Sequence, residues 1–275
     1  MISAPVLLIA ASLMAQVKPA EAAPAGLRMD IGDEATLFIP EGFRPRDGSV
    51  DVLLHLHGAP SVIEPALSDS GWPGVLVEFN RKGLSSVYTK PFADRTLFPR
   101  LLDNVLKEFR GRGLSDDPKL GRVAVSSFSA GFGGVRELLK VPEHAGRIDT
   151  LVLADSLYSG YEKDDAAARK VDPGLMAGFR DFAIRAASGP KTMIVTHSSQ
   201  VPGGYASTTE TADDLLRAVG VEATASRVDR GGGWVQSRES RKGGFLVRGF
   251  EGEGPEDHMR HLRRIAETWT WARAR

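Results

Sequence analysis

The sequence predicts an α/β fold, a mostly parallel, doubly wound sheet with helices on both faces. Short apolar runs bounded by Gly and Pro alternate along the chain with amphipathic segments, which is typical of repeated strand and helix units. In addition, 42% of the 275 residues are hydrophobic and 25% are charged. A chain of this composition can bury the core of a single domain.

The first elements are strands. Two β-rich runs at residues 27–31 and 35–40 predict a starting antiparallel hairpin. Apolar runs at 50–56 and 74–80 follow, and their continuous hydrophobicity is typical of strands that are covered on both faces. Residues 96–109 then place apolar side chains at helical spacing, so a helix is expected there.

The second half of the chain repeats this alternation. Strands are expected at 122–128, 148–155 and 192–197, and helices at 130–140, 173–187 and 208–219. The stretch 223–250 has two β-like runs around a Gly- and charge-rich connection, which predicts a hairpin at the sheet edge. One apolar stripe marks a single closing helix, and it consists of Met259, Leu262, Ile265, Ala266 and Trp269.

Residues 1–23 are expected to be a signal peptide. An apolar run over 5–15 precedes small residues of AxA type that end at Ala22 or Ala23. The run is too short for a permanent membrane span, and no later stretch is long and apolar enough for one. We therefore expect a soluble, exported protein, periplasmic or secreted, in which residues 24–275 form one domain.

The charged residues and the absence of cysteine exclude several classes of function. Lys and Arg number 35, as do Asp and Glu, so no general attraction to nucleic acid or to anionic lipid is expected. Without cysteine the chain has no disulfides, no thiolate zinc site and no cysteine nucleophile. Hydroxyl groups, carboxylates and six histidines remain to carry chemistry, and we expect no metal and no cofactor.

The segment RVAVSSFSAGFGGVREL, residues 122–138, predicts a strand, a turn of small residues and a helix. Ser129 lies at the turn, with Ser127 two residues before it and Gly131 two residues after it. This pattern resembles a nucleophile elbow, in which small neighbours let the serine hydroxyl stand clear of the sheet. The usual motif is GxSxG, and here serine replaces its first glycine.

The elbow, together with the pair His57-Gly58 after an earlier strand, makes residues 49–271 similar to the α/β-hydrolase family. The resemblance implies a serine nucleophile at Ser129. It also implies an oxyanion hole formed by the backbone N–H groups of Gly58, Ala59 and Ala130.

The family places its histidine last in the chain, just before the closing helix. GEGPEDHMRHL has His258 at this position, and His261 is the alternative. The second strand after the elbow, where the acid usually follows, ends here without a carboxylate. The resemblance therefore favours Asp155, at the end of DTLVLADS, as the acid, with Asp229 and Asp257 as alternatives.

These residues predict a serine hydrolase that cleaves a carboxylic ester through an acyl-enzyme. Its substrate would be a small molecule or a polymer-borne acyl group. Trp72, Tyr88, Phe128 and Tyr158 are expected to line the substrate pocket, and residues 156–188 are a candidate for a small cap.

Two other functions stay open. His55-x-His57 and His258-x-x-His261 pair imidazoles as metal hydrolases do, although both lack the companion acidic residues of HxHxD and HExxH sites. A binding protein without catalysis would use the same scaffold. A dinucleotide-binding turn is disfavoured because Arg136 stands where its third glycine belongs.

Overall fold

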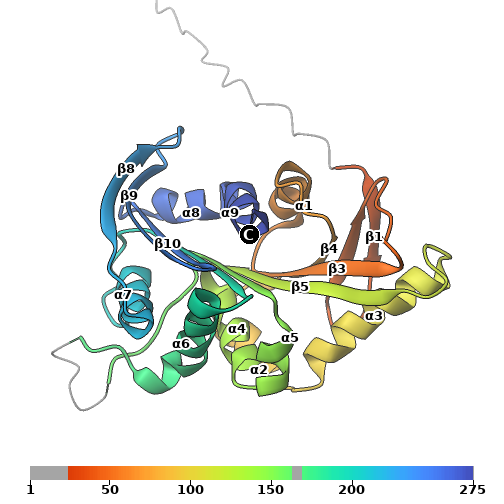
Figure 1. Cartoon of the computed structure of the whole chain (residues 1–275), viewed down its shortest axis with the longest axis horizontal. Coiled ribbons are helices and arrows are strands. Elements are labelled where there is room, and N and C mark those ends of the chain that lie inside the picture. The colour runs from red at the N-terminus through yellow and green to blue at the C-terminus, as the bar shows by residue number, and fades with distance from the viewer. Residues whose placement is uncertain (1–23, 163–168, 275) are drawn as a thin grey trace, which may run out of the picture.

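The computed structural model describes residues 24–162 and 169–274, and the expected signal peptide lies outside this part of the chain. One sheet crosses the molecule with the strand order β1-β2-β4-β3-β5-β6-β7-β10-β9-β8 (Figure 1). The strands are β1 (Gly26–Asp30), β2 (Thr36–Pro40), β3 (Ser49–Leu56), β4 (Val75–Phe79), β5 (Lys119–Phe128), β6 (Thr150–Ala154), β7 (Thr192–His197), β8 (Thr224–Asp229), β9 (Val235–Lys242) and β10 (Phe245–Phe250).

The central strands, from β4 through β3, β5, β6 and β7 to β10, run parallel to one another. Antiparallel pairs close both edges, with β1 and β2 on one side and β9 and β8 on the other. Every residue of β4 and of β7 is buried, as expected for strands covered on both faces. The predicted fold class, including its N-terminal antiparallel hairpin, is confirmed.

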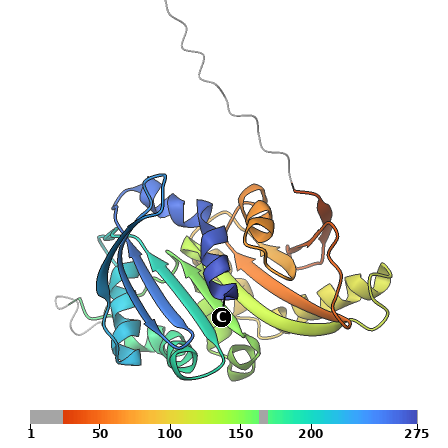
Figure 2. The same cartoon turned by 45° about the horizontal axis from the view of Figure 1, so that its top comes forward.

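Helices cover both faces of the sheet, as Figure 2 shows. Their bounds are α1 (Pro60–Asp69), α2 (Ser86–Phe92), α3 (Leu97–Gly111), α4 (Phe132–Leu139), α5 (Pro142–Arg147), α6 (Pro173–Ser188), α7 (Thr208–Val219), α8 (Pro255–Arg263) and α9 (Ile265–Arg273). α1, α8 and α9 share one hydrophobic core with the sheet, and α2 to α7 share the other (Figure 1). Alternate residues of β3 enter the two cores, with Leu53 in one and Leu54 in the other.

Two predicted elements differ from the structure. The closing helix is broken at Arg264, where φ is −104° and ψ is 17°, so α8 and α9 replace a single helix. The predicted apolar stripe still packs against one core, because Leu262, Ile265 and Trp269 all belong to it. The stretch 223–250 holds three strands instead of two, and the third, β10, joins the parallel part of the sheet.

The segment 156–188, named above as a candidate cap, divides into parts with different surroundings. Its last part, α6, buries Met176, Phe179 and Phe182 in the core against the sheet. A cap formed by the remainder, which includes residues 163–168 outside the described part, stays a prediction. Among the residues that the structure describes, no helix combines the length and the apolar character that crossing a bilayer requires.

Candidate active site

Three neighbouring strands of the parallel sheet end in an unusual backbone conformation. The residues directly after β3, β5 and β6 are His57, Ser129 and Asp155, and their φ angles are 70°, 47° and 44°. Left-handed backbone at a residue other than glycine costs on the order of 1–3 kcal/mol, and such strain concentrates at functional sites. The carboxyl edge of the sheet between β3 and β6 is therefore the first place to look for a site.

Ser129 begins a 3₁₀ turn, η1 (Ser129–Gly131), that leads from β5 into α4. The turn packs tightly against β3, because a Cβ atom at Gly131 would lie 2.4 Å from the carbonyl oxygen of Leu56. Ser127 occupies the position of the first glycine of the elbow motif, and its side chain is accommodated there. It is buried, and its Oγ is 2.8 Å from Ser156 Oγ, with which it shares a hydrogen bond.

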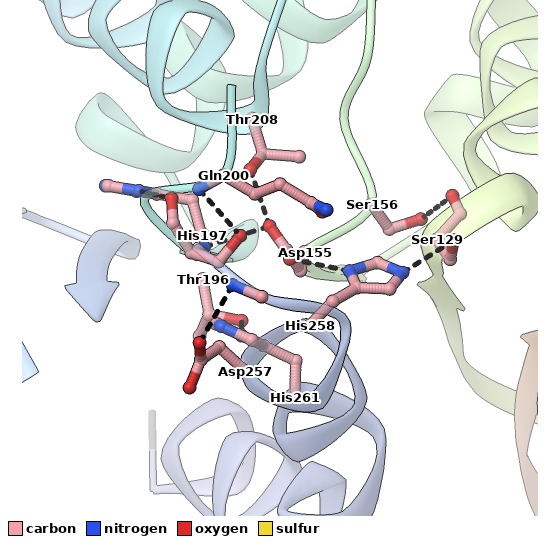
Figure 3. A network of polar contacts seen from close by, with 12 residues as sticks. Ser129, Asp155, Ser156, Thr196, His197, Gln200, Thr208, Asp257, His258 and His261 are labelled. Carbon is pink, nitrogen blue, oxygen red and sulfur yellow. Dashed lines mark hydrogen bonds and ion pairs between the residues drawn. The ribbon is translucent and has the colours of Figure 1, made fainter. Parts of the chain in front are cut away.

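Three predicted site residues lie in one hydrogen-bonded row (Figure 3). Ser129 Oγ is 2.9 Å from His258 Nε2, and His258 Nδ1 is 2.7 Å from Asp155 Oδ2. The serine follows β5, the aspartate follows β6, and the histidine lies in the first turn of α8. The fold thus brings together a hydroxyl, an imidazole and a carboxylate from distant parts of the sequence.

Asp155 is fully buried, and its second oxygen is also occupied. Oδ1 accepts hydrogen bonds from the backbone N–H of Ser198 (2.9 Å) and from Thr208 Oγ1 (2.5 Å). Burial by itself raises the pKa of this carboxyl, but nearby His261 and the hydrogen bond from His258 outweigh it. The net result is a pKa well below the usual range. The carboxylate is therefore ionised at neutral pH.

The ionised carboxylate fixes the protonation of the histidine ring. An ionised Asp155 can only accept, so His258 Nδ1 carries the proton that it donates. Nε2 is then free to accept the hydrogen bond of the Ser129 hydroxyl. This is the tautomer that a general base for the serine requires.

Phe128 holds the ring of His258 from one side. The two rings are stacked, with centroids 4.6 Å apart and an interplanar angle of 28°. Phe128 also stacks against His57, with centroids 5.9 Å apart and an interplanar angle of 14°. The side chain of His258 remains 16% exposed, so a bound molecule can reach the imidazole.

His261, the alternative to His258, has a different environment. It is fully buried, and its Nδ1 shares a hydrogen bond with Thr196 Oγ1 at 2.8 Å. Burial lowers the pKa of His261 to about 4, so the ring is neutral. The hydrogen bond to Ser129 belongs to His258 (Figure 3).

The two alternative acids, Asp229 and Asp257, accept hydrogen bonds within local turns. Asp229 accepts a hydrogen bond from the backbone N–H of Gly231, 2.8 Å away, in the connection between β8 and β9. Asp257 accepts from the N–H of Gly254 at 2.9 Å and pairs with Arg260, at the start of α8. Asp155, by contrast, contacts the imidazole of His258 directly.

The backbone donors predicted for an oxyanion hole lie at the ends of the paired strands β3 and β5. Gly58 has no room for a side chain, since a Cβ there would lie 2.7 Å from His55 Nε2 and 2.8 Å from Ile63 Cγ2. Ala59 is the N-cap of α1, and Ala130 lies in η1. N–H groups at the start of a helix have no intrahelical acceptor, so they are available to a developing negative charge.

The histidine pairs considered for a metal are engaged with other partners. His55 Nδ1 is 3.0 Å from Ser126 Oγ, and His57 Nδ1 is 2.7 Å from the hydroxyl of Tyr88. In residues 24–162 and 169–274 no three His, Cys, Asp or Glu side chains are grouped so that they could hold a metal ion. The metal-hydrolase alternative therefore finds no set of ligands in this part of the chain.

Ser129 and His258 open into a cavity of about 380 Å³, a size suited to a small ligand. It lies above the carboxyl edge of the sheet, between the elbow and the segment that follows β6. Its lining consists of Leu84, Ser85, Ser129, Ala130, Phe132, Arg136, Tyr158, Ser159, Gly160, Gln200, Tyr205 and His258.

Of the four residues expected to line the substrate pocket, Tyr158 does so. Trp72 precedes β4, so it lies at the amino edge of the sheet and packs against the core under α1 and α9. Tyr88 is fully buried in α2, where its hydroxyl bonds His57, and Phe128 is buried between two imidazole rings. The expectation for Trp72, Tyr88 and Phe128 is not met, because loop or strand-end position did not reveal which way each ring turns.

Three polar residues that bind Asp155 or Ser129 were not predicted. Thr208 and Ser198 bind the carboxylate of Asp155, and Ser156 Oγ donates to the carbonyl oxygen of Ser129 at 2.9 Å. Ser198 and Ser156 each follow the end of a parallel strand, a position that could have drawn attention to them. Thr208 begins α7, and nothing in the sequence connects it to Asp155.

No protein-family model matches the chain, and no curated protein matches it in sequence. Among solved structures it is similar to S-formylglutathione hydrolase from Staphylococcus aureus, with 13% identity, a TM-score of 0.43, and 90% of this chain and 96% of that chain covered. It is also similar to acetyl xylan esterase from Aspergillus awamori, with 11% identity, a TM-score of 0.45, and 86% and 98% covered. Similarities at this level say nothing of the substrate or the chemistry of this chain.

Proposed function

We propose that the protein is a serine hydrolase that cleaves carboxylic esters through an acyl-enzyme. One observation carries the proposal: the hydrogen-bonded row from Ser129 through His258 to Asp155, with distances of 2.9 and 2.7 Å, at the wall of a cavity. A serine hydroxyl is a weak nucleophile unless a base accepts its proton, and this row supplies the base.

The mechanism follows from the position of each group. Ser129 Oγ attacks the acyl carbon of the ester while His258 Nε2 accepts the hydroxyl proton. Asp155 stabilises the imidazolium that forms, and the backbone N–H groups of Gly58, Ala59 and Ala130 donate to the oxyanion. The imidazolium then gives its proton to the departing alcohol, which leaves an acyl group on Ser129.

In the second half of the cycle a water molecule replaces the alcohol. His258 removes a proton from the water, whose oxygen attacks the acyl carbon, and the bond to Ser129 Oγ breaks as the proton returns to it. The products are a carboxylic acid and the free enzyme. The acyl group could belong to a small molecule or to a polymer, since the cavity is open to the surface.

A set of p-nitrophenyl esters with short acyl chains tests this proposal. We expect wild-type protein to hydrolyse at least one of them and Ser129→Ala to lower kcat by about 10⁴ to 10⁶. Ser85→Ala, which removes another hydroxyl from the cavity lining, is the matched control and should stay within about tenfold of wild type.

Three results would contradict the proposal of a serine hydrolase. Full turnover by Ser129→Ala on every ester that wild type hydrolyses would refute the nucleophile. Loss of turnover after a chelator is added would favour a metal hydrolase. Intact folding with no turnover of any ester would favour a binding protein.

We also propose that the protein is exported, to the periplasm or to the medium. The support is the sequence pattern of residues 1–23, an apolar run followed by small residues. Expression of the full chain in a bacterium, followed by fractionation and N-terminal sequencing, tests this. A mature chain outside the cytoplasm that begins near residue 23 is expected, and an uncleaved cytoplasmic chain would contradict it.

A further inference from the structure

The cavity beside Ser129 contains an arginine, Arg136, with which none of the described carboxylates forms an ion pair. Arg136, on α4, lines the cavity together with Ser129 and His258. Its Nη2 donates to the carbonyl oxygen of Tyr158 at 2.5 Å, and its guanidinium lies 4.9 Å from the centre of the Phe132 ring. Among the described residues, no carboxylate forms an ion pair with it.

Two other half-buried arginines, Arg180 and Arg248, are paired with carboxylates. Arg180 forms two hydrogen bonds with Asp214, at 2.7 and 2.6 Å, and Arg248 binds Glu239 at 2.6 Å. Arg136 differs from these two in that no described carboxylate forms an ion pair with it. Its Nε is also buried with no hydrogen-bond partner in the described structure, a feature that it shares with one nitrogen of Arg248.

Burial lowers the pKa of Arg136, yet a guanidinium keeps its charge in proteins. Glu137 and Asp172 lie near enough to favour the charged form, but neither forms an ion pair with Arg136 in the described structure. A desolvated cation without a direct ion pair is costly, and an incoming anion would relieve that cost.

The side chain is directed toward the reacting end of the cavity. Helical side chains lean toward the N-terminus of their helix, and the contact of Arg136 with Phe132, one turn earlier, agrees with this direction. The N-terminus of α4 adjoins Ser129. Seven residues separate Arg136 from Ser129, which corresponds to about 10 Å of helix axis. A charge a few bonds away from the scissile carbonyl can span this separation.

The rest of the lining suits an anion. In the described part of the chain it contains no acidic side chain, and its polar members besides Arg136 and His258 are hydroxyl and amide groups. Ser159, which is 4% exposed, has an Oγ without a hydrogen-bond partner among the described residues. Arg136 is therefore the only permanent charge among the described residues that face the bound molecule.

We propose that the substrate of this site is an ester that carries a second, ionised carboxylate, which pairs with Arg136. A guanidinium matches the planar geometry of a carboxylate and can bind it through two parallel hydrogen bonds. The inference rests on the proposed function, since it names the substrate class of the same site. The carboxylate lies either on the acyl part of the ester or on its alcohol part.

Two matched pairs of esters distinguish a carboxylate on the acyl part from one on the alcohol part. The acyl arm compares mono-p-nitrophenyl glutarate with its methyl ester, and the alcohol arm compares 4-acetoxybenzoate with methyl 4-acetoxybenzoate. In each pair only the charge and one methyl group differ. We expect kcat/KM to favour the charged member of at least one pair by about ten- to a hundredfold, the range for a hydrogen-bonded charge pair.

Three variants assign this preference to its residue. Arg136→Gln, which keeps a donor toward Tyr158, should abolish the preference for the charged ester. Arg136→Lys should keep part of it, because the positive charge remains. Lys140→Gln is the matched control: Lys140 is the C-cap residue of α4, is exposed and pairs with Glu137, so the preference should persist.

A binding measurement makes the test independent of turnover. In the Ser129→Ala background, calorimetry should show that the charged ester binds about tenfold or more tightly than the uncharged one, and that Arg136→Gln removes the difference. Equal affinity for both members of both pairs would overturn the inference, even where wild type hydrolyses all four esters. Selective binding without hydrolysis by wild type would instead support the carboxylate site and refute the proposed function.

Discussion

Two buried carboxyl groups in the parallel part of the sheet differ in charge at neutral pH. Asp155, after β6, receives hydrogen bonds from His258, Ser198 and Thr208, and its pKa lies well below the usual range. Glu78, in β4, is 3% exposed, and its Oε1 has no hydrogen-bond partner in the described structure. Burial, reinforced by nearby charge, raises the pKa of Glu78 to about 8.

The cation near Glu78 is already paired with another carboxylate. Arg28, a cation that favours the charged form of Glu78, donates hydrogen bonds to Glu64 at 2.7 and 2.5 Å. Glu64 then adds to the effect of burial on Glu78. Two carboxyls with similar burial thus reach opposite protonation states because only one has its own donors. A shifted pKa alone does not mark a functional site; the partners of the group do.

The largest expected effect is on turnover. Asp155→Asn should lower kcat by about 10⁴, because a neutral amide neither stabilises the imidazolium nor enforces its tautomer. Glu78→Gln should leave kcat within about threefold, since Glu78 is already neutral. Initial rates on the best ester measure both. Asp229→Asn is the matched control, and loss of activity there with an active Asp155→Asn would move the acid to Asp229.

The second effect is on stability, and it concerns Glu78. The pKa of Glu78 is raised in the folded state from 4.5 to about 8, so its stabilising contribution is complete below pH 4.5 and is lost as the pH rises to 8. Glu78→Gln cannot ionise and should raise the free energy of unfolding at pH 8 by on the order of 2 kcal/mol.

Urea unfolding at pH 4 and at pH 8 measures this difference. The gain from Glu78→Gln should be small at pH 4, where both chains are uncharged at this position. An equal effect of the substitution at both pH values would show that Glu78 does not titrate in this range.

The third effect isolates one donor of Asp155. Thr208→Val removes the hydroxyl that binds Oδ1 at 2.5 Å and leaves a side chain of similar shape. The carboxylate loses stabilisation, so its pKa should rise and kcat at neutral pH should fall by about tenfold. Thr209→Val, at the next residue, is the comparison variant. Identical rates for Thr208→Val and wild type would show that this hydrogen bond does not support the site.

The smallest effect is expected for Asp257, the second alternative to Asp155 as the acid. Asp257→Asn weakens the turn that begins α8, where Asp257 binds the N–H of Gly254. We expect a loss of about 0.5–1 kcal/mol of stability and no change in kcat. Thermal unfolding and initial rates together check this, and a hundredfold loss of activity would mean that Asp257 takes part in the chemistry.

The sequence predicted well the elements whose ends are marked by local sequence features. The strand 192–197 and the helix 208–219 were predicted with their observed bounds. A capping box at Ser207 and a left-handed Gly220 explain why that helix has sharp ends. The short helices α2 and α5, of 7 and 6 residues, were not identified, since fewer than two turns give no clear periodicity.

For the site, the sequence was informative where chemistry and local structure coincide. Ser129 and His258 each lie where a strand or loop meets a helix, and the motif around each is local. The choice of Asp155 among three acids depended on the resemblance. Its donors Ser198 and Thr208 are 43 and 53 residues away along the chain, so their contacts depend on sheet order, which no local pattern contains.

The most direct test of the account is covalent labelling with a fluorophosphonate, followed by peptide mass spectrometry. We predict one phosphonyl group per chain, on Ser129, with labelling much slower in Asp155→Asn and unchanged in Glu78→Gln. Labelling of a different serine, or equal rates in wild type and Asp155→Asn, would contradict the claim that a buried, ionised Asp155 makes Ser129 a nucleophile.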